Sequence, residues 1–157
     1  EKLLGAKHRL TLLSQSNLAS ALQAHGQHQE AASLYRETLA IRTEVLGAEH
    51  QDTLQAAISL ANSLHSQGQC ENAGQLHKET LDSRRRLLGA EHPQTLASAN
   101  SFAVCLQDQG KFEEAALLHR KTLHVRKRVL GASHRHSLQS ANNLARVLRD
   151  QGQFKEA

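Results

Sequence analysis

The sequence contains few aromatic residues and almost no proline. Its 157 residues include no Trp, no Met, one Tyr, three Phe and one Pro. The core must therefore be built from Leu, Ala and Val, which suits closely packed helices better than sheets rich in β-branched and aromatic side chains. One Pro and nine Gly also leave little material for the many turns of an all-β fold. These shortages favour an all-helical protein.

Long apolar runs and cysteine pairs are also missing. The longest uninterrupted apolar run, 102–106, is far shorter than the roughly 20 residues that a membrane-spanning helix needs. Two cysteines, Cys70 and Cys105, make no disulfide framework and indicate the cytoplasm or another reducing intracellular compartment. The chain begins without an initiator Met or a charged-then-apolar leader, so we expect it to be a fragment of a longer protein.

What the sequence does contain is an internal repeat. The pattern Leu-Gly-Ala-x-His occurs four times at intervals of 42 residues, and residues 47–88 match residues 89–130 at 21 of 42 positions. Such a fixed period indicates a repeat architecture in which each repeat is one supersecondary unit. We predict a single array over 1–157, with repeats at 5–46, 47–88 and 89–130 and a partial repeat at 131–157.

Each repeat has helical periodicity in two segments. In the second repeat, an apolar stripe runs from Leu54 to Leu64 and breaks at Gly68, where a left-handed glycine commonly ends a helix. A second, longer stripe runs from Ala73 to Leu88. We call the shorter segment helix A and the longer one helix B. Neither helix can bury its stripe alone, so neighbouring repeats must stack.

The spacing Leu-Ala-x-x-Leu-x-x-x-Gly-x-His-x-x-Ala over residues 18–31 resembles the tetratricopeptide repeat (TPR). The 42-residue period and the stretch Leu-Gly-Ala-Glu-His-Pro-Gln-Thr-Leu at 88–96 are similar to the kinesin-light-chain type of that family. The resemblance implies an all-α, right-handed superhelical solenoid of antiparallel helix pairs. It also implies a non-enzymatic scaffold or adaptor for protein–protein interaction.

No residue pattern indicates catalysis, and we predict no cofactor, no metal site and no small-molecule substrate. One His recurs in each turn between repeats, too far from the next for zinc ligation, so we expect these side chains to hold the turn or cap helix A. They are His8, His50, His92 and His134. The glycines do not cluster as a phosphate-binding loop, and neither cysteine has a recognisable base partner.

Three arginines occupy one position of helix B: Arg42, Arg84 and Arg126. Arg84 lies within about 40° of the centre of its apolar stripe, where an arginine must find a partner or an opening to solvent. The sequence leaves two interpretations open, and they can coexist. Either the arginine pairs with a carboxylate such as Glu49 or Glu91, or it projects from the end of helix B towards the inner face of the superhelix.

Four polar residues share the position of helix A that faces away from helix B: Asn17, Ser59, Ser101 and Asn143. The resemblance implies that helix A lines a concave groove, in which an Asn here bonds the backbone of an extended peptide. Asn17 and Asn143 keep that amide, whereas Ser59 and Ser101 do not. The groove arginines of the kinesin-light-chain type correspond best to the three helix B arginines. An ordinary solvated polar face is the alternative interpretation.

The predicted partner is an extended, acidic peptide. The alternatives are a structural spacer or linker, held in a larger assembly by its convex face or its ends, and a cargo adaptor like kinesin light chain. Basic runs at 84–86 and 126–128 are compatible with nucleic acid, but the chain has almost no aromatic residues for stacking on bases. We therefore favour a protein partner over nucleic acid, and we expect no membrane insertion.

Overall fold

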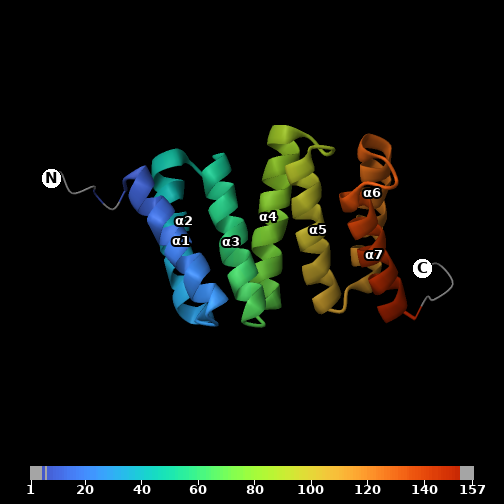
Figure 1. Cartoon of the computed structure of the whole chain (residues 1–157), viewed down its shortest axis with the longest axis horizontal. Helices are drawn as coiled ribbons and strands as arrows, with labels where there is room; N and C mark the ends of the chain where they lie inside the picture. Colours follow the sequence, from blue (N-terminus) through green and yellow to red (C-terminus); the bar gives the residue numbers. More distant parts are fainter. Residues whose placement is uncertain (1–4, 6, 153–157) are drawn as a thin grey trace. The chain divides into compact units, whose positions relative to one another are not determined.

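The computed structural model describes residues 5 and 7–152, and this part of the chain forms seven α-helices and no strands (Figure 1). Helices of 16 and 19 residues alternate along it, as the shorter and longer segments of each repeat predict. They are α1 (Arg9–Ala24), α2 (His28–Leu46), α3 (Gln51–Ser66), α4 (Cys70–Leu88), α5 (Pro93–Asp108), α6 (Phe112–Leu130) and α7 (Arg135–Asp150). The all-helical prediction is confirmed. The rest of the partial repeat, 153–157, lies outside the described residues.

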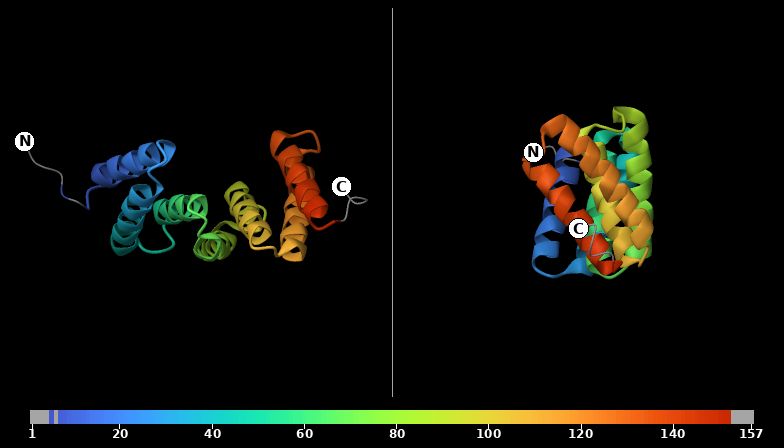
Figure 2. Two further views of the ribbon diagram at one scale, coloured as in Figure 1. Left: turned by 90° about the horizontal axis from the view of Figure 1, so that it is seen from below. Right: turned by 90° about the vertical axis from the view of Figure 1, so that its right-hand side faces the viewer.

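The chain forms two compact units, Glu1–Leu76 and His77–Ala157, whose boundary falls inside α4. In the first unit α1 packs against α2, and α2 packs against α3. In the second unit α5 packs against α6, and α6 packs against α7. Consecutive helices within a unit run in opposite directions (Figures 1 and 2). No helix among the described residues is both long and apolar enough to cross a membrane.

The repeated histidines are helix N-caps. In each case the imidazole Nδ1 accepts a hydrogen bond from the backbone N–H two residues later, as between His92 and Gln94 at 3.2 Å and between His50 and Asp52 at 3.1 Å. The same bond forms at His8 and His134. It satisfies one of the N–H groups that the start of a helix leaves without a partner. The predicted capping role is confirmed, and it requires an unprotonated Nδ1.

Glycines end both kinds of helix. Gly68, after α3, has a φ of 75°, in the left-handed region that the sequence predicts there. Gly131, after α6, has φ 94° and ψ 156°, a combination that is essentially restricted to glycine. The chain can therefore reverse direction sharply after each helix.

Small residues lie where paired helices approach closely. Ala19 on α1 and Ala31 on α2 have no exposed surface, and neither have Ala103 on α5 and Ala115 on α6. In the second unit, Leu106, Ala115, Ala116, Val147 and Leu148 form a buried cluster that joins α5, α6 and α7. The core is thus built from Leu, Ala and Val, as the shortage of aromatic residues requires.

Candidate peptide-binding surface

Two of the three helix B arginines are buried. Only 4% of Arg84 and 6% of Arg126 is exposed. Nη1 of Arg126 donates to the backbone carbonyl of His136 at 3.1 Å and to Oγ of Ser140 at 2.8 Å. Burial lowers the pKa of both guanidinium groups, because a charge is less stable away from water.

Arg84 makes the same pair of contacts one repeat earlier. Its Nη1 donates to the carbonyl of Gln94 at 3.2 Å and to Oγ of Ser98 at 3.0 Å. The hydroxyl of Thr95 returns a bond of 3.3 Å to the carbonyl of Arg84 itself. Each arginine therefore ties the second half of one helix B to the first turns of the next helix A.

These contacts correct the expectation that Arg84 and Arg126 project into a groove. Each donates instead to a carbonyl and a hydroxyl of the helix that follows it. Glu91, one of the carboxylates suggested as a partner, forms an ion pair with Arg128. The apolar stripe of helix B faces the next repeat as well as its own helix A. The sequence pattern alone does not show which of these two neighbours a given residue of the stripe contacts.

Arg42 differs because it is only half-buried. Its Nη1 donates to the carbonyl of Asp52 at 2.9 Å, and its Nη2 donates to Oγ of Ser16 at a longer 3.4 Å. Ala56 stands where Ser98 and Ser140 stand in the later repeats. Arg42 lines a hollow of about 420 Å³, whose lining also includes Lys7, Arg9, Leu12, Val45, Leu46, His50 and Asp52.

The four predicted polar residues of the A helices lie on the surface to different degrees. Asn17 on α1 is exposed, and Ser59 on α3 and Ser101 on α5 are half-buried. Asn143 on α7 is half-buried and donates from Nδ2 to Oδ1 of Asn100 on α5 at 2.7 Å. In the second unit, this bond brings the polar faces of α5 and α7 together beside Ser101.

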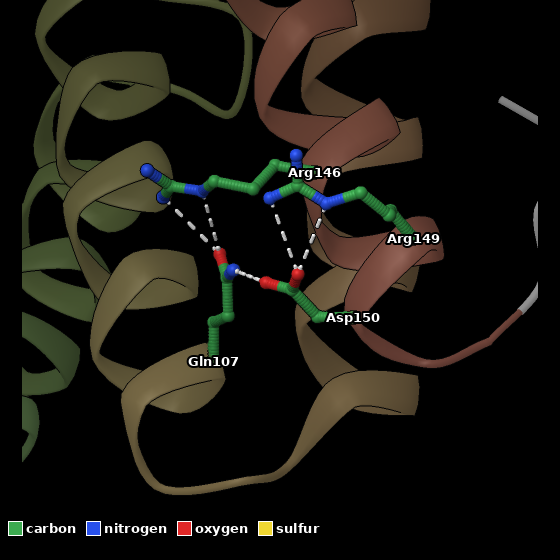
Figure 3. Close-up of polar contacts among 4 residues, drawn as sticks. All are labelled: Gln107, Arg146, Arg149 and Asp150. Carbon is green, nitrogen blue, oxygen red and sulfur yellow. Dashed lines mark hydrogen bonds and ion pairs between the residues drawn. The ribbon is translucent and has the colours of Figure 1, made fainter.

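Figure 3 shows a polar network that continues this face, and the sequence analysis did not assign it to the site. Nε and Nη2 of Arg146 donate to Oε1 of Gln107 at 3.3 and 3.1 Å. Gln107 donates to Asp150, which also pairs with Arg149 at 3.3 Å. Arg146 is exposed and lies one helical turn after Asn143. The three-residue spacing between Asn143 and Arg146 is the sequence feature from which Arg146 could have been assigned to the same face.

His119 lies buried on α6 in the second unit, with no hydrogen-bond partner for either ring nitrogen. Burial, together with the positive charges of Arg146 and Arg126, lowers its pKa from 6.5 to about 4. At the equivalent position of the first repeat, the hydroxyl of Tyr35 bonds Oγ of Ser20 at 2.8 Å. Val104 takes the place of that serine in the third repeat. Because its pKa is about 4, His119 is neutral at pH 7.

The chain matches two family models described as tetratricopeptide repeat, one over residues 52–126 and 103–157 and the other over residues 11–52. A comparison with curated proteins finds no significant match. Among the described residues, no group of three or more His, Cys, Asp or Glu side chains is placed to hold a metal ion.

Solved structures give the same result. The chain is 34% identical to a Podosopora anserina protein that is described as a kinesin light chain with nearly identical TPR-like repeats. The TM-score is 0.87, over 99% of this chain and 74% of that one. A point variant of the same Podosopora anserina protein gives 32% identity and a TM-score of 0.89, over 99% and 73% of the two chains.

A third structure, BtubC (BKLC) from P. vanneervenii, has a TM-score of 0.85 over 100% of this chain and 62% of that one. Its identity of 21% supports the fold alone. The helix pairs, their 42-residue period, the family models and the two matches above 30% identity agree. The chain therefore belongs to the tetratricopeptide repeat family, as a protein-interaction array of the kinesin-light-chain type.

Proposed function

We propose that this interaction scaffold binds an extended acidic peptide along the α5–α7 face, which we define as Asn100, Ser101, Asn143 and Arg146. One observation carries the proposal. The Asn143–Asn100 bond places amide groups beside the exposed guanidinium of Arg146, so that donors and acceptors for a peptide backbone stand next to a positive charge. Hydrogen bonds from an ionised donor to a carboxylate are about twice as strong as neutral ones.

The geometry of Arg146 supports its role. Gln107 holds the guanidinium through Nε and Nη2, which leaves Nη1 directed away from that contact. A guanidinium that is already positioned loses less side-chain entropy when it binds a carboxylate. Arg126 serves the same face indirectly, because its bond to Ser140 fixes α7 against α6.

In the first unit we propose a corresponding role for Asn17, Ser59 and Arg42. Asn17 is exposed, and Arg42 is half-buried beside the basic side chains of Lys7 and Arg9. Arg84 and Arg126 stay in the proposed site as positioning residues that hold the A helices, and Arg146 supplies the charge that faces the peptide. We propose no catalytic activity for this surface.

The test is a titration of a fluorescein-labelled decapeptide rich in Asp and Glu, followed by anisotropy. We expect Arg146→Glu to weaken binding at least tenfold, because it replaces the attractive charge with a repulsive one. Arg135→Glu, an equal charge change at an exposed position of the same helix, should change the Kd less than twofold. Binding by the parent chain should weaken as salt rises, since exposed charges are screened over about 10 Å at 0.1 M ionic strength.

Equal effects of the two substitutions would show diffuse surface charge and overturn the proposed site. If no acidic peptide binds, the spacer role becomes the better proposal. A kinesin-light-chain-like cargo adaptor is the second candidate, and the match to the Podosopora anserina protein favours it. Retention of the chain by a peptide of a transported protein, lost with Arg146→Glu, would support that candidate.

A further inference from the structure

The hollow that Arg42 lines lies in the first unit, where the start of α1, the end of α2 and the start of α3 meet, and we call it the Arg42 hollow. Its volume of about 420 Å³ is within the range of ligand-binding pockets, roughly 300–1,000 Å³. Leu12 is buried on one side of it, and Val45 and Leu46 are exposed on another. The hollow therefore has apolar walls and room for a ligand.

The rest of the lining is mostly basic. Three cationic side chains and one imidazole contribute to it: Lys7, Arg9, Arg42 and His50. Among the described residues that line the hollow, Asp52 is the only one with a carboxylate. Lys7 also pairs with Glu44, and both side chains are more than half exposed. Exposed ion pairs contribute little to stability, so Lys7 can exchange this partner for a ligand. Even with Glu44 counted, the positive charges outnumber the negative ones.

The guanidinium of Arg42 keeps hydrogen-bond donors for a ligand. Its Nη1 donates to the carbonyl of Asp52 at 2.9 Å, and its Nη2 donates to Oγ of Ser16 at 3.4 Å. A guanidinium has five N–H groups, so these two contacts leave three for other acceptors. In the later repeats a serine accepts from the equivalent arginine, but Ala56 stands at that position here. The missing hydroxyl therefore leaves Arg42 only half-buried.

His50 contributes a further donor. Its Nδ1 accepts the capping hydrogen bond from the backbone N–H of Asp52 at 3.1 Å. A neutral imidazole whose Nδ1 accepts carries its proton on Nε2. The exposed side chain of His50 thus brings an N–H group to the lining of the hollow.

The basic lining belongs to the first repeat and is not required by the fold. At intervals of 42 residues, the position of Lys7 carries Glu49, Glu91 and Ser133, and the position of Arg9 carries Gln51, Pro93 and Arg135. The position of Val45 stays apolar, as Leu87 and Val129. Two added bases and the alanine that opens Arg42 thus occur together in one repeat, while the apolar packing positions keep their character. All three differences increase the accessible positive charge at this hollow, which favours an anionic ligand.

We propose that the Arg42 hollow binds the phosphate group of a phosphorylated serine or threonine of a partner protein. At pH 7 such a group carries a charge of about −1.5 to −2 and three acceptor oxygens, more than a carboxylate offers. It can therefore accept from Arg42, Arg9 and His50 together. The inference rests on the peptide-binding role proposed above for Arg42, and it adds that this site selects phosphate. It does not depend on the α5–α7 face, because every residue of the hollow belongs to the first unit.

The probe is a fluorescein-labelled heptapeptide of Gly and Ser with one central phosphoserine, titrated with the protein and followed by anisotropy. Two matched peptides carry Ser or Glu at the central position. We expect the phosphoserine peptide to bind at least tenfold more tightly than the Glu peptide, and the Ser peptide to show no saturable binding. Inorganic phosphate, added as a competitor, should displace the phosphopeptide only at concentrations well above the Kd of that peptide.

Three variants locate the binding. Arg9→Glu should weaken binding of the phosphopeptide at least tenfold, and Arg9 is exposed, so the fold should tolerate the change. Arg36→Glu makes the same charge change at an exposed position of α2 outside the hollow and should change the Kd less than twofold. Ala56→Ser should also weaken binding, because the new hydroxyl would accept from Arg42 and draw its guanidinium out of the hollow.

Three results would overturn the proposal. Equal affinity for the phosphoserine and Glu peptides would show a general acidic-peptide site, so the proposed function would stand and the phosphate selectivity would fall. Equal weakening by Arg9→Glu and Arg36→Glu would show diffuse surface charge. Displacement by inorganic phosphate at the Kd of the phosphopeptide would assign the hollow to free phosphate.

A last variant separates this site from the α5–α7 face. Binding of the phosphopeptide that persists with Arg146→Glu and is lost with Arg9→Glu would support the Arg42 hollow, even if the acidic decapeptide fails to bind the other unit. The reverse pattern would place the phosphate on the α5–α7 face and contradict the inference.

Discussion

Arg126 on α6 donates a 2.8 Å hydrogen bond to the hydroxyl of Ser140 on α7, and Arg84 on α4 makes the equivalent 3.0 Å bond to Ser98 on α5. In both cases the serine follows the arginine by 14 residues, and a backbone carbonyl ten residues after the arginine accepts a second bond. This contact joins one repeat to the next. It therefore links the stability of neighbouring repeats, as expected in a stacked array.

Removing the hydroxyl of this contact should destabilise the second unit. Ser140→Ala leaves a buried guanidinium with one acceptor fewer, and hydrogen bonds to charged groups contribute about 1.5–3 kcal/mol. We expect the free energy of unfolding, measured with urea, to fall by an amount in that range. Ser133→Ala, in the exposed turn before α7, is the control and should have little effect. Equal losses for the two variants would contradict the structural role of the contact.

The junction between the first and second repeats offers the reverse experiment. Ala56 occupies the serine position there, and Arg42 lacks the short hydroxyl bond of its counterparts. Ala56→Ser should add that bond and stabilise the protein by about 0.5–1.5 kcal/mol. The gain should vanish in an Arg42→Met background, because the new hydroxyl would have no guanidinium to accept from. A gain that persists there would assign the effect to something other than the Arg–Ser contact.

Replacing His119 with an apolar residue should stabilise the protein. Its two ring nitrogens are buried without partners, which costs about 1–3 kcal/mol. His119→Leu keeps a similar volume and removes both polar atoms, so thermal unfolding should occur at a higher temperature. His124→Leu, an exposed histidine of the same helix, is the control. A lower melting temperature for His119→Leu would show that the imidazole has a stabilising partner.

The same residue should contribute to the pH dependence of stability. The pKa of His119 is about 4 in the folded protein, against 6.5 for an ordinary histidine. Between these values the unfolded chain binds a proton that the folded chain does not, so stability falls as pH falls from 6.5 towards 4. Above the ordinary value the residue adds no slope. Denaturant unfolding at a series of pH values from neutral down towards the folded pKa should show a shallower decline for His119→Leu than for the parent. Parallel curves would contradict the lowered pKa.

Any side chain at position 131 should lower the stability of the protein, because the backbone angles there suit only glycine. A Cβ added there would meet nothing within 4 Å, so any loss of stability comes from the backbone itself. Its φ of 94° and ψ of 156° cost a residue other than glycine about 1–3 kcal/mol. We expect Gly131→Ala to lower the free energy of unfolding by that amount. Ala132→Ser, at the next and exposed position, should have a much smaller effect; an equally small effect for Gly131→Ala would mean that the turn relaxes.

Much of the fold was predictable from the sequence because the responsible interactions are local. The 42-residue period, the two apolar stripes and the glycines at their ends located the helix pairs, since helical periodicity and left-handed turns depend on residues a few positions apart. The capping role of His92 was predictable for the same reason, because its bond to Gln94 spans two residues. The helical angle of Asn143 also placed it on a polar face of α7, where it donates to Asn100 of α5.

The arrangement of the candidate site depended on contacts between helices. Helical angle placed Arg126 on the apolar stripe but did not show that Ser140, on the next helix, would bury its guanidinium. Arg146 entered the site through a bond to Gln107, 39 residues away. The repeat period determined which helices form. Only tertiary packing decided which arginine is enclosed and which stays in water, because that depends on side chains brought together from different repeats.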